Sequence, residues 1–285
     1  MNLFIFGLGY SSCRFLDRFA ASFTNIVGTV RSDTARHALR ALGCEALLFG
    51  PEQTDPAIAS HLAKADLLLV SVPPGASADP VLAAFAAPIA ESRIRRVIYL
   101  STVGVYGDHG GNWIDETASV VGGQGRRKAR IEAEAAWSKV AAGRTTILRL
   151  ARIYGTRRNA LINLKAGTAH RIVKPGQVFN RIHVDDVATS IAAAVASDKA
   201  GTWNICDDEP APPQDVVAFA AELMGIAPPP EIDFVAADMS EMARSFYQTS
   251  NRISSARMKR DLKVQLAYPT YRDGLTALWA AGEGR

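Results

Sequence analysis

Apolar residues follow two patterns along the chain. Short, wholly apolar runs alternate with longer segments in which apolar residues recur with a helical period. The short runs are typical of strands buried on both faces, and the longer segments are typical of amphipathic helices. The predicted strands span residues 3–6, 26–30, 44–49, 66–72, 96–100, 145–150 and 203–206. The predicted helices after the first span residues 35–42, 58–64, 81–90, 126–140, 184–195, 213–224 and 275–280.

The alternation of strands and helices predicts the architecture. It is typical of a parallel sheet covered on both faces, so we expect an α/β protein with a doubly wound, Rossmann-like sheet. Ligands of such sheets bind at the carboxyl ends of the strands. After residue 155 the loops lengthen and proline-rich turns appear. We therefore expect residues 1–155 to form a dinucleotide-binding domain, to which 180–206 returns, and residues 156–285 to form a smaller C-terminal lobe that binds substrate.

Composition and charge narrow the class of protein. The 285 residues carry a net charge of only +4 and have no long run of Lys or Arg, so nucleic acid is not an expected partner. No apolar run reaches membrane-spanning length, and no cleavable apolar segment precedes the first strand, so we expect a cytoplasmic protein without a membrane partner. Cys13, Cys44 and Cys206 lie far apart and match no metal spacing, which favours reduced thiols and no metal. Whether the protein forms a homodimer is left open.

The first strand ends in a glycine-rich turn. Residues 3–6 run into Gly7-Leu8-Gly9, and a helical pattern with Phe15 and Phe19 follows. Gly7 would allow a tight turn, and Gly9 would let a pyrophosphate approach the backbone at the helix N-terminus. The position of the usual third glycine is Ser12, which is still small. The same turn closes ordinary strand–helix units, so by itself it indicates dinucleotide binding only weakly.

Two other strand ends lie where a dinucleotide would pass. The second strand is followed by Arg31 and Ser32, where an acid would select NAD through its ribose and a cation would accept the 2′-phosphate of NADP. Arg31 therefore favours NADP, with NAD as the alternative and a solvated surface arginine as the non-functional explanation. The fourth strand ends at Pro73, which either borders the cofactor or simply ends the strand.

Several segments together resemble one family. They include the run from Tyr99 through Ser101-Thr102 to Tyr106-Gly107, and the run from Asn180 to Val187, which we call the late motif. The other segments span residues 112–116, 147–155, 203–205 and 269–275. Their order and spacing resemble the extended or atypical short-chain dehydrogenase/reductases, the NAD-dependent epimerase/dehydratase group. This resemblance covers nearly the whole chain and implies a Rossmann-like fold and NAD(P)-dependent oxidoreductase chemistry.

The resemblance also implies roles for individual residues. In this family a tyrosine in a Tyr-x-x-x-Lys motif is the acid–base group, the lysine holds the nicotinamide ribose, and a serine or threonine binds the substrate oxygen. Thr102 matches the hydroxyl position with Ser101 beside it, and Lys128 matches the lysine. The tyrosine position is Gln124, which cannot titrate. Three explanations stay open: Tyr106 replaces the tyrosine, the reaction needs no protein acid there, or the protein does no chemistry.

Other charged residues have both functional and structural explanations. The end of the sixth strand and the residues after it are rich in arginine, and these side chains could hold an anionic substrate or form a solvated basic loop: Arg149, Arg152, Arg157 and Arg158. His183 with the acids after it is more typical of a helix start than of a metal site, with Asp185 as the expected cap. We therefore carry two hypotheses. One is an NADP-dependent oxidoreductase acting on a polar, anionic alcohol or carbonyl substrate, and the other is a non-catalytic NAD(P)-binding sensor or regulator.

Overall fold

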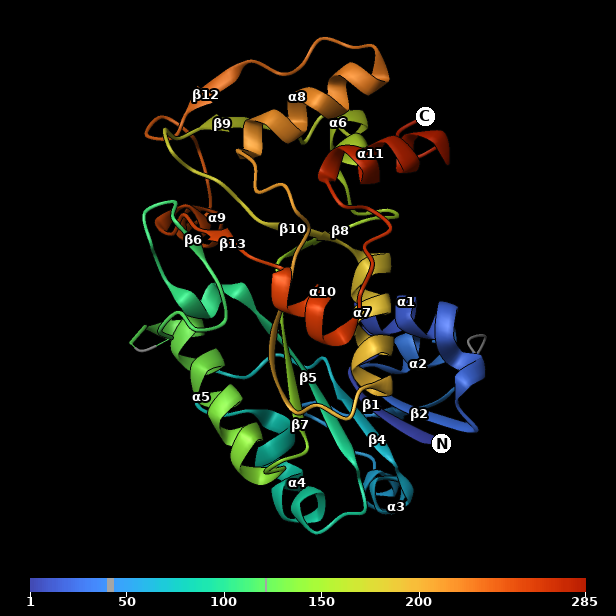
Figure 1. Ribbon diagram of the computed structural model, residues 1–285. Helices are drawn as coiled ribbons and strands as arrows, with labels where there is room; N and C mark the ends of the chain where they lie inside the picture. Colours follow the sequence, from blue (N-terminus) through green and yellow to red (C-terminus); the bar gives the residue numbers. More distant parts are fainter. Residues whose placement is uncertain (40–43, 121) are drawn as a thin grey trace.

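The core of the protein is a parallel sheet of seven strands. A computed structural model describes residues 1–39, 44–120 and 122–285. The strands follow the order β3-β2-β1-β4-β5-β7-β11 (Figure 1). From β1 the chain first adds strands on one side and then, from β4 on, adds them on the other side. They are β1 (Asn2–Phe6), β2 (Asn25–Val30), β3 (Glu45–Leu48), β4 (Leu67–Val70), β5 (Arg96–Thr102), β7 (Thr145–Leu150) and β11 (Gly201–Ile205). This order confirms the predicted doubly wound, Rossmann-like sheet, whose switch point lies at the carboxyl ends of β1 and β4.

Helices cover both faces of the sheet because its strands are apolar on both faces. Along β1, Leu3 and Ile5 face one core and Phe4 and Phe6 face the other, as the strand alternation requires. The first core lies under α1 (Tyr10–Phe19) and α7 (Val184–Ala196). The second core lies under α3 (Ala57–Lys64), α4 (Pro80–Ala90) and α5 (Gly125–Val140). The shorter elements at the sheet are η1 (Ala20–Ser22), α2 (Asp33–Leu39) and η3 (Val103–Tyr106).

A second lobe continues beyond the carboxyl end of β7 and occupies the upper part of Figure 1. Its strands form short parallel pairs, and its helices pack around Tyr154, Leu161 and Tyr271. The pairs are β8 (Arg152–Tyr154) with β10 (Arg181–His183), and β9 (Arg171–Val173) with β12 (Glu231–Asp233). The helices are α6 (Ala160–Lys165), α8 (Pro213–Met224), α9 (Glu241–Ser245), η4 (Phe246–Gln248) and α11 (Tyr271–Ala280).

The chain crosses between the lobes more often than the sequence predicts. Residues 180–206 do return, since α7 covers the sheet and β11 forms its edge. A further return consists of β13 (Arg252–Ile253), which pairs with β6 (Trp113–Ile114), and α10 (Ala256–Leu262). Its side chains Met258 and Leu262 lie in the core beneath α1 and α7. We propose the division at residue 155 with residues 252–264 added to the first domain.

Most predicted elements agree with the structure to within a few residues. The predicted strand 66–72 is shorter, because β4 ends at Val70. The predicted helix 275–280 begins earlier, at Tyr271, because Thr270 and Asp273 form a reciprocal capping box. The predicted helix 35–42 begins earlier, at Asp33, and its last residues lie outside the described part of the chain. Within the described residues, none of the helices has the length and apolar character needed to span a bilayer.

Candidate functional site

The two glycines of the glycine turn, residues 7–9, have different structural demands. Gly7 has a φ of 93°, in the left-handed region, and a Cβ there would lie 3.1 Å from Cγ2 of Val72. Its N–H donates to Oγ1 of Thr29 at 3.0 Å. Gly9 has a φ of −101°, and nothing lies within 4 Å of the position of its Cβ. Gly7 is therefore needed for the turn itself, whereas Gly9 keeps the space in front of the turn open.

The start of helix α1 presents unsatisfied donors to that space. Gly9 is the N-cap residue, and no described side chain accepts a hydrogen bond from the first turn. The first turn contains no acidic residue. The first N–H groups of a helix lack intrahelical acceptors and carry a partial positive charge, so this end of α1 can bind an anion through its backbone. Ser12, in the same helix, is fully buried, so only a small side chain fits at this position.

The other predicted cofactor residues lie at the same edge of the sheet. Arg31 is exposed directly after β2. The hydroxyl of Ser32 accepts a hydrogen bond from the backbone N–H of Ala35 at 3.3 Å and so helps to begin α2. Pro73 is exposed after β4, whose following residue Ser71 is hydrogen-bonded to the carbonyl of Phe6. Parallel strands bring these residues to one edge, with Arg31 and Pro73 open to solvent.

Side chains at the other end of this edge are bonded to one another. Oγ of Ser101 donates to Oε1 of Glu134 at 2.5 Å, and Nη2 of Arg149 lies 2.6 Å from Oε2 of the same carboxylate. The Arg149 guanidinium lies over the Tyr106 ring, 4.8 Å from its centroid, and the Tyr106 hydroxyl donates to Asn204 at 2.6 Å. We call these five residues the polar network. It joins β5, η3, α5, β7 and β11 in the interior.

Membership of the polar network changes the roles expected of three residues. Tyr106 is buried, its hydroxyl has a partner, and burial raises its pKa. It is therefore a poor replacement for a proton-transferring tyrosine, contrary to the sequence-based alternative. Ser101 and Arg149 are equally buried and paired, so neither is free to contact a cofactor or an anionic substrate. Burial with good partners at each polar atom indicates a structural role.

Thr102 differs from its buried neighbour. It is the last residue of β5, is partly exposed, and its Oγ1 accepts a hydrogen bond from the N–H of Gly104 at 3.2 Å. The hydroxyl hydrogen is still available, because a hydroxyl both donates and accepts. Thr102 therefore retains the position and the chemistry expected of a group that orients a substrate oxygen.

The expected tyrosine and lysine positions on helix α5 are both exposed. Gln124 is the N-cap of α5 and is exposed, and the Lys128 side chain is 64% exposed and lies 3.7 Å from Glu132. The helix face against η3 carries Arg127, whose Nε donates to the carbonyl of Val105 at 3.0 Å. Residues four apart share a helix face, so Gln124 and Lys128 lie together on the solvent side. No described contact joins Gln124 or Lys128 to Thr102, so their place at a Tyr-x-x-x-Lys position stays a prediction.

The four arginines after β7 do not form one basic cluster. Arg149 belongs to the polar network, and Arg157 is exposed. Arg158 lies over the ring of Tyr10, with its Cζ 5.7 Å from the centroid. Arg152 lies between two aromatic rings of the second lobe. Arg152, Arg157 and Arg158 are exposed, and the backbone N–H of Arg157 donates to Glu283 at 3.0 Å.

The comparisons with known proteins bear on this arrangement. A model of the NAD dependent epimerase/dehydratase family matches residues 81–206, which include β5, η3, α5, β7 and the late motif. Residues 81–206 belong to this family. A solved structure of a conserved protein of unknown function from Silicibacter pomeroyi DSS is 43% identical, with a TM-score of 0.90 and 99% of each chain covered.

More distant structures share the fold. A candidate NAD-dependent epimerase/dehydratase from Methylobacillus flagellatus is 24% identical, with a TM-score of 0.73 and 98% of each chain covered. UDP-glucuronic acid 4-epimerase from Bacillus cereus, solved in complex with NAD, is 14% identical, with a TM-score of 0.76 and 97% of each chain covered. The comparison with curated proteins found no match to this chain.

The late motif of this epimerase/dehydratase chain is structural. Nδ1 of His183 accepts the N–H of Asp185 at 3.2 Å and so caps α7, while Asp185 itself pairs with Arg14 of α1 at 2.5 Å. The prediction that Asp185 is the cap was therefore wrong, since the histidine has this role. Asp186 accepts the backbone N–H of Ala267 and thereby fixes the C-terminal segment. In the described chain, no three His, Cys, Asp or Glu side chains are placed to hold a metal ion.

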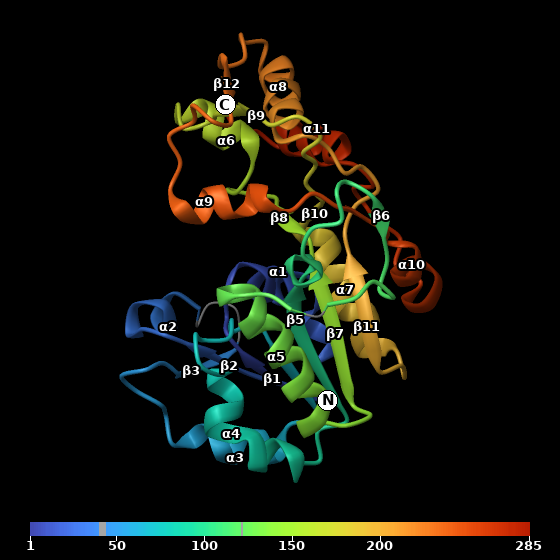
Figure 2. The same cartoon turned by 90° about the vertical axis from the view of Figure 1, so that its left-hand side faces the viewer.

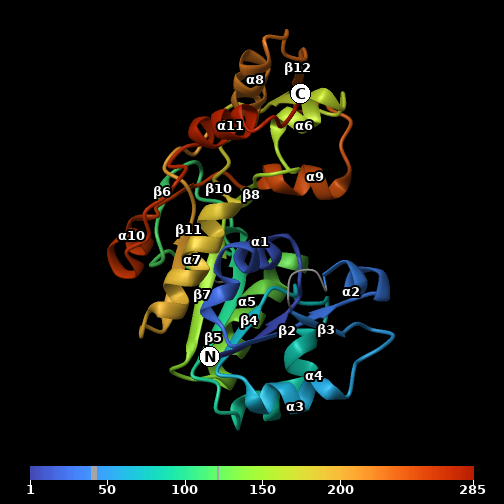
Figure 3. The same ribbon diagram turned by 90° about the vertical axis from the view of Figure 1, so that its right-hand side faces the viewer.

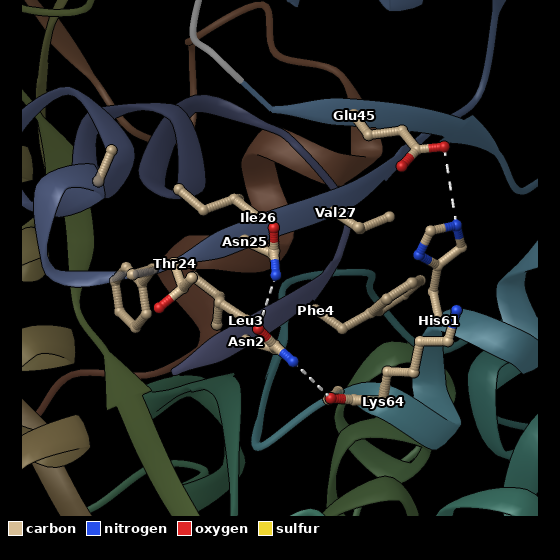
Figure 4. Close-up of a pocket in the computed structure, with 13 residues that line it drawn as sticks. Asn2, Leu3, Phe4, Thr24, Asn25, Ile26, Val27, Glu45, His61 and Lys64 are labelled. Carbon is tan, nitrogen blue, oxygen red and sulfur yellow. Dashed lines mark hydrogen bonds and ion pairs between the residues drawn. The ribbon is translucent and has the colours of Figure 1, made fainter.

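A pocket of about 610 Å³ lies away from these residues, at the amino-terminal edge of the sheet (Figure 4). Its polar groups bond to one another: the amide of Asn2 donates to the carbonyl of Lys64 at 2.9 Å, and His61 lies 3.6 Å from Glu45. Ligands of doubly wound sheets bind at the opposite edge. We therefore place the candidate site at the glycine turn and the carboxyl ends of β2, β4 and β5.

Proposed function

We propose that the protein binds a nicotinamide dinucleotide along the carboxyl edge of its sheet and serves as an oxidoreductase. The observation that carries this proposal is the uncapped start of α1 in front of the open Gly9 position. A pyrophosphate fits this donor set, because backbone N–H groups at a helix N-terminus bind phosphate oxygens without a side chain. When bound, the dinucleotide supplies or accepts a hydride.

We further propose that NADP is preferred over NAD. The exposed guanidinium of Arg31 follows β2, where a cation can pair with a 2′-phosphate. Pro73 borders the same edge after β4. A nearby acid would favour NAD by binding its ribose hydroxyl. Asp33 is such an acid, but it already pairs with Arg36 at 2.5 Å.

The proposed substrate is a small, anionic alcohol or carbonyl compound. Thr102 would orient its reacting oxygen, since this residue is partly exposed at the end of β5 and its hydroxyl hydrogen is available. Gln124 cannot transfer a proton, and Tyr106 is buried and paired. Proton exchange therefore falls to water or to the substrate itself, which corresponds to the explanation that needs no protein acid at the tyrosine position.

A second candidate function is a non-catalytic NAD(P)-binding sensor. The observation that favours it is at the start of α5, where the tyrosine position is the untitratable Gln124 and the exposed Lys128 pairs only with Glu132 among the described carboxylates. Dinucleotide binding is common to both candidates. They differ in whether any anionic carbonyl compound is reduced while the dinucleotide is oxidised.

The first experiment measures dinucleotide affinity. NADPH and NADH are titrated calorimetrically into the unmodified protein and into Gly9→Val. A Cβ at Gly9 meets no atom within 4 Å, so the variant should fold. Its branched side chain should occupy the pyrophosphate space and lower NADPH affinity by about a hundredfold or more, the loss expected for charge-assisted hydrogen bonds.

Thermal unfolding of the same two proteins is the control. A melting temperature within a few degrees of the unmodified protein shows that the loss of affinity is local. Equal NADPH affinity in the two folded proteins would contradict the proposed site. Turnover of anionic aldehydes and ketones with NADPH, followed at 340 nm, then separates enzyme from sensor: binding without any turnover supports the sensor.

A further inference from the structure

An arginine of the second lobe lies between two aromatic rings without a counter-ion. Arg152 is on β8, and its Cζ is 5.1 Å from the ring centroid of Phe179 and 5.5 Å from that of Phe246. Among the residues that the structure describes, no carboxylate forms an ion pair with Arg152, and the residue is exposed. The guanidinium is thus held by ring contacts, which leaves its N–H groups available to a ligand.

The surroundings of Arg152 favour an anion. Burial among the neighbouring side chains lowers the pKa of the Arg152 guanidinium, and nearby Arg158 lowers it further, while Tyr247 acts in the opposite direction. An arginine remains charged at neutral pH, so a partly desolvated cation without a partner is unfavourable in the empty protein. An anion with two oxygens would satisfy both its charge and its donors.

Exposed apolar side chains lie next to this cation. Met242 on α9 is 51% exposed and Phe246, at the start of η4, is 50% exposed. They are four residues apart on continuous helical turns, so they are neighbours on one surface. We call these two residues the apolar shelf. In Figures 2 and 3, α9 lies on the side of the second lobe that faces α1 and α2.

We propose that Arg152 is the anion anchor of the substrate site, and that the substrate is a carboxylate whose short apolar body lies on the apolar shelf. Phe246 links the two halves of this subsite, because its ring contacts the guanidinium and forms part of the shelf. The identification of the ligand as the substrate rests on the proposed function, whereas binding to Arg152 does not. From the sequence we expect a polar, anionic substrate. The carboxylate keeps the anionic group and adds a short apolar part.

The test uses a defined probe and needs no dinucleotide. 3-Phenylpropionate and its neutral amide, 3-phenylpropionamide, are titrated into the full chain by calorimetry, with inorganic phosphate as a third probe. The acid should bind at least about tenfold more tightly than the amide, the scale of one charge-assisted contact. Arg152→Met should remove this preference, and Arg152→Lys should restore only part of it, because an ammonium lacks the planar pair of donors.

Two further variants make the test specific. Phe246→Ala should weaken acid and amide by similar factors, because it removes apolar contact that both ligands share. Arg272→Met is the matched control: Arg272 also lies over aromatic rings, at 5.0 Å from Phe219 and 4.8 Å from Tyr271, but pairs with Glu209 at 3.0 Å. It should change neither affinity.

The outcomes separate this inference from the proposed function. Unchanged acid binding in folded Arg152→Met, no binding of 3-phenylpropionate by the unmodified protein, or phosphate binding as tight as that of the acid with no effect of Phe246→Ala would overturn the inference. NADPH titration of the same proteins reports on the proposed function separately. Failure to bind NADPH together with an Arg152-dependent acid preference would remove the oxidoreductase and leave the carboxylate site.

Discussion

The glycine turn and the polar network lie at the same edge of one sheet, yet only the glycine turn is open to a ligand. At the turn, nothing lies within 4 Å of a Cβ placed on Gly9, and the first donors of α1 have no side-chain cap. In the polar network, Ser101, Glu134 and Arg149 are buried and bonded to one another. Backbone groups thus provide for binding at one end, while side chains stabilise the interior at the other.

This difference bears on function. A site whose polar groups already have protein partners has no need of a ligand, whereas unsatisfied backbone donors favour one. The glycine turn therefore offers backbone donors of the kind that the proposed dinucleotide needs. Among the residues considered from the sequence, Thr102 keeps a hydroxyl that can orient a substrate oxygen, and none of them is placed as a proton-transferring group.

The largest expected effect comes from breaking the polar network. Arg149→Met leaves the Glu134 carboxylate buried without its cation, and both side chains are only 7% exposed. Removal of one partner from a buried pair costs about 3–5 kcal/mol, so the free energy of unfolding, measured with urea, should fall by about that amount. Arg157→Met, at an exposed arginine, should change it by less than about 0.5 kcal/mol. A loss below 1 kcal/mol in Arg149→Met would mean that the network is not structural.

The next effect concerns the helix that packs behind the glycine turn. His183 caps α7, which is joined to α1 through Asp185 and Arg14, and burial lowers the pKa of His183 from 6.5 to about 4. The unfolded chain therefore binds this proton more readily than the folded one. Its stabilisation is complete above pH 6.5 and is lost as the pH falls toward 4, by about 3 kcal/mol in total.

Urea unfolding from pH 8 to pH 4 measures this loss. His183→Asn keeps a capping acceptor but cannot titrate, so the difference in stability between the two proteins should shrink by about 3 kcal/mol as the pH falls. The comparison is needed because Asp207, whose pKa burial raises to about 8, changes stability in the opposite direction. A difference that is constant with pH would contradict a neutral, buried His183.

Cofactor preference gives a smaller effect and tests the proposed dinucleotide site directly. Arg31→Ala should lower NADPH affinity about ten- to a hundredfold and leave NADH affinity unchanged, because only NADPH carries the 2′-phosphate. Arg36→Ala is the matched control, since Arg36 already pairs with Asp33 at 2.5 Å. Calorimetric titration of both dinucleotides into the three proteins decides the matter. Equal affinity of the unmodified protein for NADH and NADPH would remove the preference.

The sequence predicted the sheet well because burial determines it. β1 is covered on both faces, so Leu3, Phe4, Ile5 and Phe6 are all buried and form an apolar run that any strand in this position would need. The glycine turn was predictable for a similar reason: a φ of 93° at Gly7 favours glycine, whatever surrounds it. These features depend on local conformation and on burial alone.

The side-chain partners could not be predicted in the same way. Ser101 bonds to a residue 33 positions away, and the Tyr106 hydroxyl bonds to Asn204, 98 positions away. The return of residues 252–264 was missed because β13 and β6 contribute only two residues each, too few for a pattern. The orientation of α5 did leave a signal: stepping back from buried Trp137 by helical spacing reaches Glu134, Arg130 and Arg127, not Lys128.

The smallest expected effect tests that orientation. Under the family resemblance, Gln124→Tyr would restore the acid–base group beside Lys128 and raise turnover by up to about 10²–10⁴-fold. In the structure, Gln124 and Lys128 share the exposed side of α5, and Lys128 lies 3.7 Å from Glu132. We therefore expect Gln124→Tyr to change NADPH-dependent reduction of aldehydes by less than about twofold, because a phenol in water keeps a pKa near 10 and contacts no substrate.

Lys128→Ala sharpens the same point through binding. It should leave NADPH affinity within about twofold of the unmodified protein, since an exposed i,i+4 ion pair contributes only about 0.3–0.5 kcal/mol. Thr102→Val is the contrasting variant: it keeps the shape of a residue at the end of β5, removes the hydroxyl, and should abolish whatever turnover the protein has. A tenfold loss of NADPH affinity in Lys128→Ala would show that α5 turns toward the dinucleotide when it binds, so that the tyrosine–lysine position would be assembled by the ligand rather than by the empty fold.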